Sequence, residues 1–136
     1  MKKLLLLTAV ILLAAACKKK EFAPEGPTDI RIRNNSSQAF SEVVLKTSEY
    51  EEDAFTFASI AGGATSEYHR FKKAYPKAEL SLKVNIGGSL TSITTGTVDY
   101  TYMQYLSTQR VTMVVDIINN VPKIINVIPE EELVLK

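Results

Sequence analysis

Apolar and polar residues alternate with a period of two through most of the chain from residue 28 onwards. The alternation is clearest over residues 78–86, where one face carries Ala78, Leu80, Leu82, Val84 and Ile86. Successive side chains of a β-strand point to opposite faces, so this segment predicts a strand with one buried face. Gly87 and Gly88 follow it and predict a tight hairpin turn.

Other segments with alternation or β-branched residues predict further strands on both sides of this one. They are residues 29–33, 42–47, 55–60, 65–71, 90–94, 100–106, 110–118 and 123–128. Turns are predicted between them, and residues 61–64 are expected to join 55–60 to 65–71 as a hairpin. Residues 110–118 are apolar on both faces, which predicts a central strand covered on both sides.

The number and spacing of these segments indicate the fold class. About seven to nine short strands, spaced by about 8 to 12 residues and with no convincing helix, predict an all-β antiparallel two-sheet sandwich of immunoglobulin-like architecture. A small β-barrel is the alternative. The chain has no tryptophan and one cysteine, so it lacks the sequence marks of true immunoglobulin domains.

The first residues have a different pattern. Lys2 and Lys3 precede an apolar run over residues 4–16 that only Thr8 interrupts, and Cys17 follows at once. This is the pattern of a secretory signal peptide. A membrane-spanning helix needs about 20 apolar residues, so the run is too short for one and residues 1–16 are expected to be cleaved.

The junction Ala14-Ala15-Ala16-Cys17 resembles the lipobox of bacterial lipoproteins, and the Lys18-Lys19-Lys20 that follows is similar to the start of many Bacteroidota lipoproteins. The resemblance implies cleavage before Cys17, a diacylglyceryl group on its thiol and acylation of the new amine. It also implies the outer membrane, because enterobacterial lipoproteins that stay in the inner membrane have an aspartate directly after the cysteine, where this chain has Lys18. It implies the periplasmic face, because Bacteroidota lipoproteins that are exported to the cell surface have an acidic signal after the cysteine, where this chain has lysines. The alternative for Cys17 is a buried free thiol.

The remaining chain divides into a tether over residues 17–27, rich in charge, proline and glycine, and one domain over residues 28–136. Sixteen basic residues balance fifteen acidic ones, so no nucleic-acid partner is expected. The tether lysines are expected to lie against anionic lipid headgroups.

Few side chains suggest reaction chemistry. His69 is the only histidine, and strand alternation places Glu67 on its side. A general base would need a carboxylate within hydrogen-bond reach; the alternative is a solvent-facing strand histidine. Neither a set of zinc ligands nor a catalytic residue is predicted.

Glu49, Glu51, Glu52 and Asp53 could surround a calcium ion, but a solvated acidic loop is favoured and no metal is predicted. Residues 130–132, three glutamates, are expected to end the ordered chain.

Tyr100 and Tyr102 are the candidate ligand-binding residues, because the predicted strand over 100–106 puts both on one face. Exposed tyrosines stack on sugar rings or hold an extended peptide; the alternative is that they fill a core-facing surface.

The sequence thus predicts a non-enzymatic envelope lipoprotein with no cofactor, which binds or scaffolds an unknown envelope protein or glycan. The alternatives are an accessory glycan- or peptide-binding module and a small hydrolase.

Overall fold

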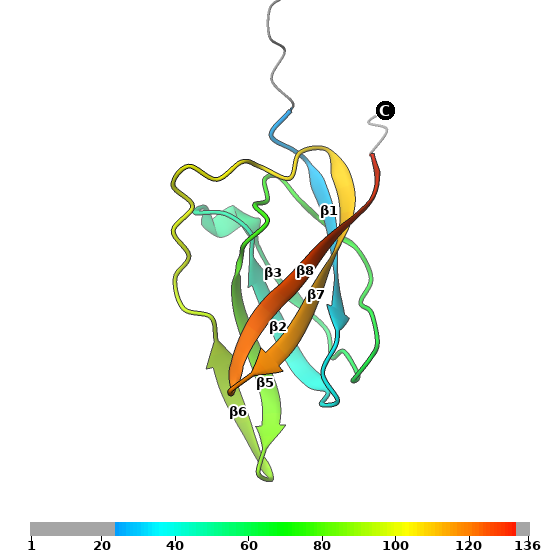
Figure 1. The fold of residues 1–136 in the computed structure, drawn as a ribbon, viewed down its shortest axis with the longest axis vertical. Helices are drawn as coiled ribbons and strands as arrows, with labels where there is room; N and C mark the ends of the chain where they lie inside the picture. Colours follow the sequence, from blue (N-terminus) through cyan, green and yellow to red (C-terminus); the bar gives the residue numbers. More distant parts are fainter. Residues whose placement is uncertain (1–23, 133–136) are drawn as a thin grey trace, which may run out of the picture.

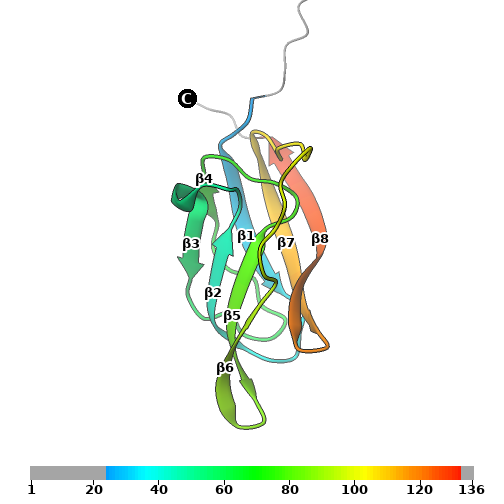
Figure 2. The ribbon, with the colours of Figure 1, turned by 90° about the vertical axis from the view of Figure 1, so that its left-hand side faces the viewer.

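The computed structural model describes residues 24–132, which form a sandwich of two four-stranded sheets (Figures 1 and 2). The first sheet has the order β4-β1-β7-β8, with β1 at Thr28–Asn34, β4 at His69–Phe71, β7 at Gln109–Ile118 and β8 at Val121–Glu132. The second has the order β3-β2-β5-β6, with β2 at Phe40–Lys46, β3 at Ala54–Phe57, β5 at Glu79–Ile86 and β6 at Ser89–Thr94. The all-β sandwich prediction is confirmed. The sheets do not close into a barrel.

The core lies between the sheets and is made by their inward-facing apolar side chains. The largest that are almost completely buried are Phe40, Phe71, Ile30, Ile32, Leu45, Leu80, Leu82 and Met113. In β5 the buried residues alternate with partly exposed ones as the sequence pattern predicts. A layer of interdigitating aliphatic and aromatic side chains is the usual core of a two-sheet sandwich.

One strand pairing differs from the antiparallel expectation: β1 and β7 are parallel, with Ile30 beside Val111 and Ile32 beside Met113. The other strand pairs are antiparallel. The two parallel strands lie far apart in the sequence, so no hairpin sets their relative direction. β7 is interior to its sheet, and Thr112 and Val114 on its outer face are also buried, whereas Ile118 at its end is 40% exposed, so the two-sided cover holds for the middle of the strand only.

The predicted hairpin over residues 61–64 is wrong. β3 pairs with β2, whereas the segment after the turn enters the other sheet, where β4 pairs with β1. Two isolated bridges mark the crossing: Ile60 pairs with Phe40, and Thr65 pairs with Arg33. Glycines at a turn allow the chain to reverse, but the pairing of the flanking residues decides whether it returns to the same sheet.

The predicted strand over residues 100–106 is also wrong, because residues 95–108 form a long loop between β6 and β7. Tyr102 and Ser107 have left-handed backbone conformations, with φ of 63° and 66°, which a strand cannot contain. The three glutamates at residues 130–132 are the last residues of β8, and Glu131 and Glu132 pair with the start of β7.

Two tight turns match their sequence signals. Gly87 and Gly88, with φ of 60° and 88°, join β5 to β6, and Asn119 and Asn120, with φ of 53° and 60°, join β7 to β8. Positive φ at both central residues is the requirement of the hairpin turn that matches strand twist, and glycine and asparagine tolerate it best.

The last residues of the predicted tether are held against the body. The Glu25 carboxylate lies 2.7 Å from the Lys73 ammonium, and the Thr108 hydroxyl donates a hydrogen bond of 3.2 Å to the Gly26 carbonyl. A Cβ at Gly26 would lie 1.8 Å from the Lys72 carbonyl oxygen, so only glycine allows this approach. Residues 1–16 and Cys17 lie outside the described residues. Within residues 24–132 we find no helix of the length and apolar character that crossing a bilayer requires.

Candidate ligand pocket

The structure separates the two candidate tyrosines. Tyr100 is buried, with 9% of its surface exposed, and its hydroxyl donates a hydrogen bond of 3.1 Å to the Lys46 carbonyl. Tyr102 is fully exposed, at 101%. They therefore do not form an exposed pair on a concave sheet: Tyr100 packs in the interior of the loop, and Tyr102 offers its ring to solvent.

Tyr100 belongs to a stack of three rings at the end of the sandwich. Tyr75 lies in the middle, with its ring centroid 4.9 Å from that of Tyr100 and 4.5 Å from that of Tyr105, and the interplanar angles are 22° and 20°. Burial, with the nearby Glu79 and Glu49 carboxylates, raises the pKa of Tyr100 to about 12, so the hydroxyl stays protonated. The stack fixes the position of residues 95–108, which have no strand pairing of their own.

Lys73 connects this stack to the tether. Its ammonium lies 5.4 Å from the centroid of the Tyr105 ring and 5.5 Å from that of Tyr50. The hydrogen bond with the Glu25 carboxylate raises the pKa of Lys73, so this ammonium is charged at neutral pH. The arrangement is a cation held by two aromatic rings and one carboxylate.

A cavity of about 500 Å³ opens beside the stack. It is lined by residues 98–103 together with Glu49 and Tyr75. Its acidic groups are Glu49 and Asp99, and the Asp99 carboxylate accepts a hydrogen bond of 2.9 Å from the Thr101 amide. Hydrogen bonds from Thr101 lower the pKa of Asp99. We call this cavity the tyrosine pocket; Glu49 and Asp99 were not predicted as part of it.

His69 does not have the surroundings of a general base. Its ring stacks on Phe55, with centroids 3.5 Å apart and an interplanar angle of 10°, and meets Phe71 edge-on at 4.9 Å. Within residues 24–132 its imidazole has no hydrogen bond with a carboxylate, and Glu67 is not its partner. Burial lowers the pKa of His69, and the charge of Asp29 opposes that shift only in part. The ring is partly buried rather than freely exposed, because it packs among phenylalanines.

The four acidic residues considered as calcium ligands do not form one group around a common point. Asp53 is buried, at 1% exposure, and accepts hydrogen bonds from the Ser48 hydroxyl at 2.6 Å and the Lys72 amide at 3.1 Å. Glu51 pairs with Lys46 and Glu52 with Lys72. In the described part of the chain, no three acidic, histidine or cysteine side chains come close enough to hold a metal ion.

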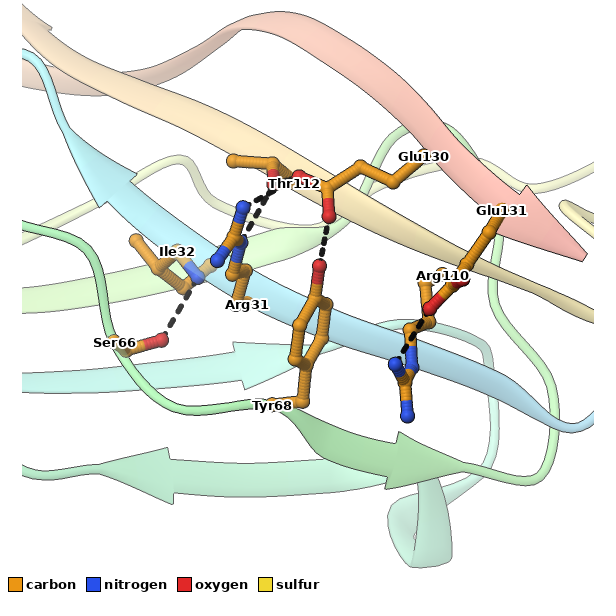
Figure 3. A network of polar contacts seen from close by, with 8 residues as sticks. All are labelled: Arg31, Ile32, Ser66, Tyr68, Arg110, Thr112, Glu130 and Glu131. Carbon is orange, nitrogen blue, oxygen red and sulfur yellow. Dashed lines mark hydrogen bonds and ion pairs between the residues drawn. The ribbon is translucent and has the colours of Figure 1, made fainter. Parts of the chain in front are cut away.

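A charged network that the sequence analysis did not single out covers the outer face of the first sheet (Figure 3). One row crosses all four strands with alternating charge, because the strand register places Arg70, Asp29, Arg110 and Glu131 side by side. Arg70 donates to Asp29 at 2.7 Å, and Arg110 pairs with Glu131 at 2.5 Å. The hydrogen bond from Arg70 is the main cause that lowers the pKa of Asp29.

A second row of the network centres on Glu130. Its carboxylate accepts hydrogen bonds from Arg31 at 2.7 Å, from the Thr112 hydroxyl and from the Tyr68 hydroxyl. Hydrogen bonds from Thr112 and Tyr68 lower the pKa of Glu130 to about 2. The Tyr68 ring lies between two guanidinium groups, 4.9 Å from that of Arg31 and 5.2 Å from that of Arg110. The network is internally balanced in charge, so we assign it to stability rather than to ligand binding.

Comparison with known proteins adds no assignment to these sites: no family model, no curated protein and no solved structure matches the chain. The geometry of the tyrosine pocket is therefore the basis of the proposal about ligand binding.

Proposed function

We propose that the protein is a non-enzymatic lipoprotein of the bacterial cell envelope, fixed by lipids on Cys17 to the periplasmic face of the outer membrane, whose β-sandwich binds a ligand in the tyrosine pocket. The anchor half of this proposal rests on the sequence of residues 1–20. The binding half rests on the pocket.

Physical chemistry supports the anchor. Each acyl methylene buried in the bilayer contributes about 0.8 kcal/mol, and a single acyl chain gives only reversible binding. The two or three chains that lipoprotein processing attaches make the attachment effectively permanent. The tether then keeps the body within a short distance of the membrane, because even a fully extended chain spans at most about 3.5 Å per residue.

The observation that carries the binding half is Tyr102. A large aromatic side chain that is fully exposed, at a loop residue with φ of 63°, forgoes both burial and an unstrained backbone. It lies on the wall of a cavity whose inner rings are already fixed by stacking. Such exposed aromatic side chains beside a preformed cavity are typical of binding surfaces.

The anchor is tested by labelling cells of a Bacteroidota species with radioactive palmitate while they express the protein or its Cys17→Ser variant. We expect label on the first protein only, and we expect it in the outer-membrane fraction. The variant is expected to lack label and to leave the membrane fraction. Equal labelling of both proteins, or the absence of label from both, would contradict the proposal.

A further inference from the structure

The tyrosine pocket combines aromatic rings with carboxylates, which is the chemistry that recognises organic cations. We propose that it binds the basic side chain of a lysine or arginine from a partner peptide. The inference rests on the proposed binding function and names its ligand class. It goes beyond the expectation of a glycan or an unspecified peptide because it assigns a charge to the ligand.

The acidic groups of the pocket are available to a ligand. Within residues 24–132, neither Glu49 nor Asp99 forms an ion pair with a lysine, arginine or histidine of the protein. Both line the cavity together with Tyr75, Tyr100 and Tyr102, and of these three tyrosines only Tyr102 has an exposed ring. A cation near an aromatic face is attracted by the ring quadrupole, and two nearby carboxylates add to that attraction.

The protein already holds one lysine in the same way. Lys73, next to the pocket, is placed over the rings of Tyr105 and Tyr50 and is paired with Glu25. Tyr105 stacks on Tyr75, and Tyr75 lines the pocket. The ring stack thus has a bound ammonium near its Tyr105 end and an open, acid-lined cavity at its Tyr100 end. A second basic side chain in that cavity would repeat the arrangement on the other side.

The pocket favours a peptide side chain over the amine of a lipid headgroup. A phospholipid ammonium is joined to a phosphate, which Glu49 and Asp99 would repel. A lysine or arginine instead carries its charge on an apolar stem, and Val98 and Met103 in the lining offer apolar surface to such a stem.

A nuclear magnetic resonance titration tests the inference with matched probes. The protein, purified in detergent from whole cells, is titrated with Nα-acetyl-lysine methyl ester and, separately, with the uncharged Nα-acetyl-norleucine methyl ester. We expect saturable amide shifts at Glu49 and in residues 98–103 with the lysine ester only, and weaker binding at higher salt. Equal shifts with both esters, or shifts elsewhere on the surface, would overturn the inference.

Variants of exposed residues report on the site without threatening the fold. Tyr102→Ala is expected to raise the dissociation constant for the lysine ester about two- to fivefold, from the usual strength of an exposed cation–π contact. Glu49→Gln is expected to raise it by a similar factor, whereas Glu67→Gln, an exposed glutamate outside the pocket, is expected to leave it unchanged. If Glu67→Gln and Glu49→Gln have the same effect, the attraction is not specific to the pocket and the proposal is wrong.

Two further probes separate the inference from the broader function. Phosphoethanolamine is expected to bind more weakly than the lysine ester, and tighter binding would overturn the peptide assignment in favour of a lipid headgroup. A neutral oligosaccharide that shifts residues 98–103 while the lysine ester does not would overturn the cation assignment but keep the pocket as a binding site. Loss of palmitate labelling concerns the anchor alone and leaves this titration unaffected.

Discussion

His69 occupies a place among aromatic side chains where a neutral ring fits best. Burial between Phe55 and Phe71 lowers its pKa below the ordinary value of 6.5. The unfolded chain therefore takes up a proton at a higher pH than the folded protein does. The contribution of the neutral His69 ring to the free energy of unfolding is therefore fully present above pH 6.5. It is lost as the pH falls from 6.5 towards the lower pKa of the folded state.

The His69→Phe variant removes this titration while keeping a flat ring against Phe55. We expect its free energy of unfolding, measured by urea denaturation between pH 7.5 and pH 5, to depend less on pH than that of the wild-type protein. Parallel pH profiles for the two proteins would show that His69 does not titrate differently in the folded state.

Asp53 joins two loops through its buried carboxyl group. It accepts hydrogen bonds from the Ser48 hydroxyl and from the amides of Lys72 and Lys73. The Asp53→Ala variant leaves these donors without their acceptor, so we expect a loss of about 2 to 4 kcal/mol in the free energy of unfolding.

The neighbouring Glu52 provides the matched control. Its contact with Lys72 is a salt bridge between side chains that are 60% and 72% exposed. Glu52→Ala is therefore expected to cost less than about 1 kcal/mol in the same denaturation experiment. A comparable loss in both variants would contradict the role assigned to Asp53.

At the scale of strands, the sequence predicts those elements whose own pattern is sufficient. β5 alternates cleanly and β7 is apolar on both faces, and both lie where expected. Residues 100–106 contain three tyrosines, a composition that favours a strand, but they form a loop because Tyr100 packs on Tyr75 and Tyr102 adopts a left-handed backbone. Aromatic content favours a strand only where neighbouring strands are available to pair, and that depends on distant residues.

Pairing between distant strands is the part that local pattern leaves open. The β1–β7 pair is parallel, and β4 joins β1 rather than β3. Each choice depends on contacts between residues separated by tens of positions, which hydrophobic alternation does not contain. The charged row from Arg70 to Glu131 became visible only once this register was known.

The β7–β8 hairpin depends on the turn at Asn119 and Asn120, both with positive φ. Replacing both by alanine keeps the chain length but places Cβ-bearing residues without a compensating amide side chain in the left-handed region. We expect thermal and urea denaturation to show a loss of about 2 kcal/mol. Asn120→Gly is the control, expected to change stability by less than about 1 kcal/mol, because glycine accepts this conformation. Equal losses in both variants would contradict this account of the turn.

At the scale of the whole molecule, the start of β1 and the end of β8 lie at the same end of the sandwich, and the β5–β6 hairpin lies at the other (Figure 1). The tether contact between Glu25 and Lys73 brings the ring stack and the tyrosine pocket to the tether end. If lipids on Cys17 hold the chain, the pocket lies at the end of the body from which the tether leaves. A partner of the pocket is then expected to be a protein segment that lies close to the membrane.

The sequence predicts two residues of the proposed pocket, Tyr100 and Tyr102, but expects them on one strand face, whereas both lie in a loop and Tyr100 is buried. Tyr100 and Tyr102 could be chosen because exposed tyrosines are common in binding sites. Glu49 and Asp99 lie fifty positions apart, and only the fold of the loops brings them to one cavity. The sequence groups Glu49 with its neighbours as a calcium candidate, but Glu49 is exposed whereas Asp53 is buried.

The central claim is that this β-sandwich is attached to a membrane through Cys17. The most direct test is the mass of the N-terminal peptide of the protein purified from Bacteroidota membranes. The account predicts a peptide that begins at Cys17 and carries a diacylglyceryl group on the thiol with an acyl chain on the amine. A peptide that begins at Met1, or one that begins at an unmodified Cys17, would contradict it.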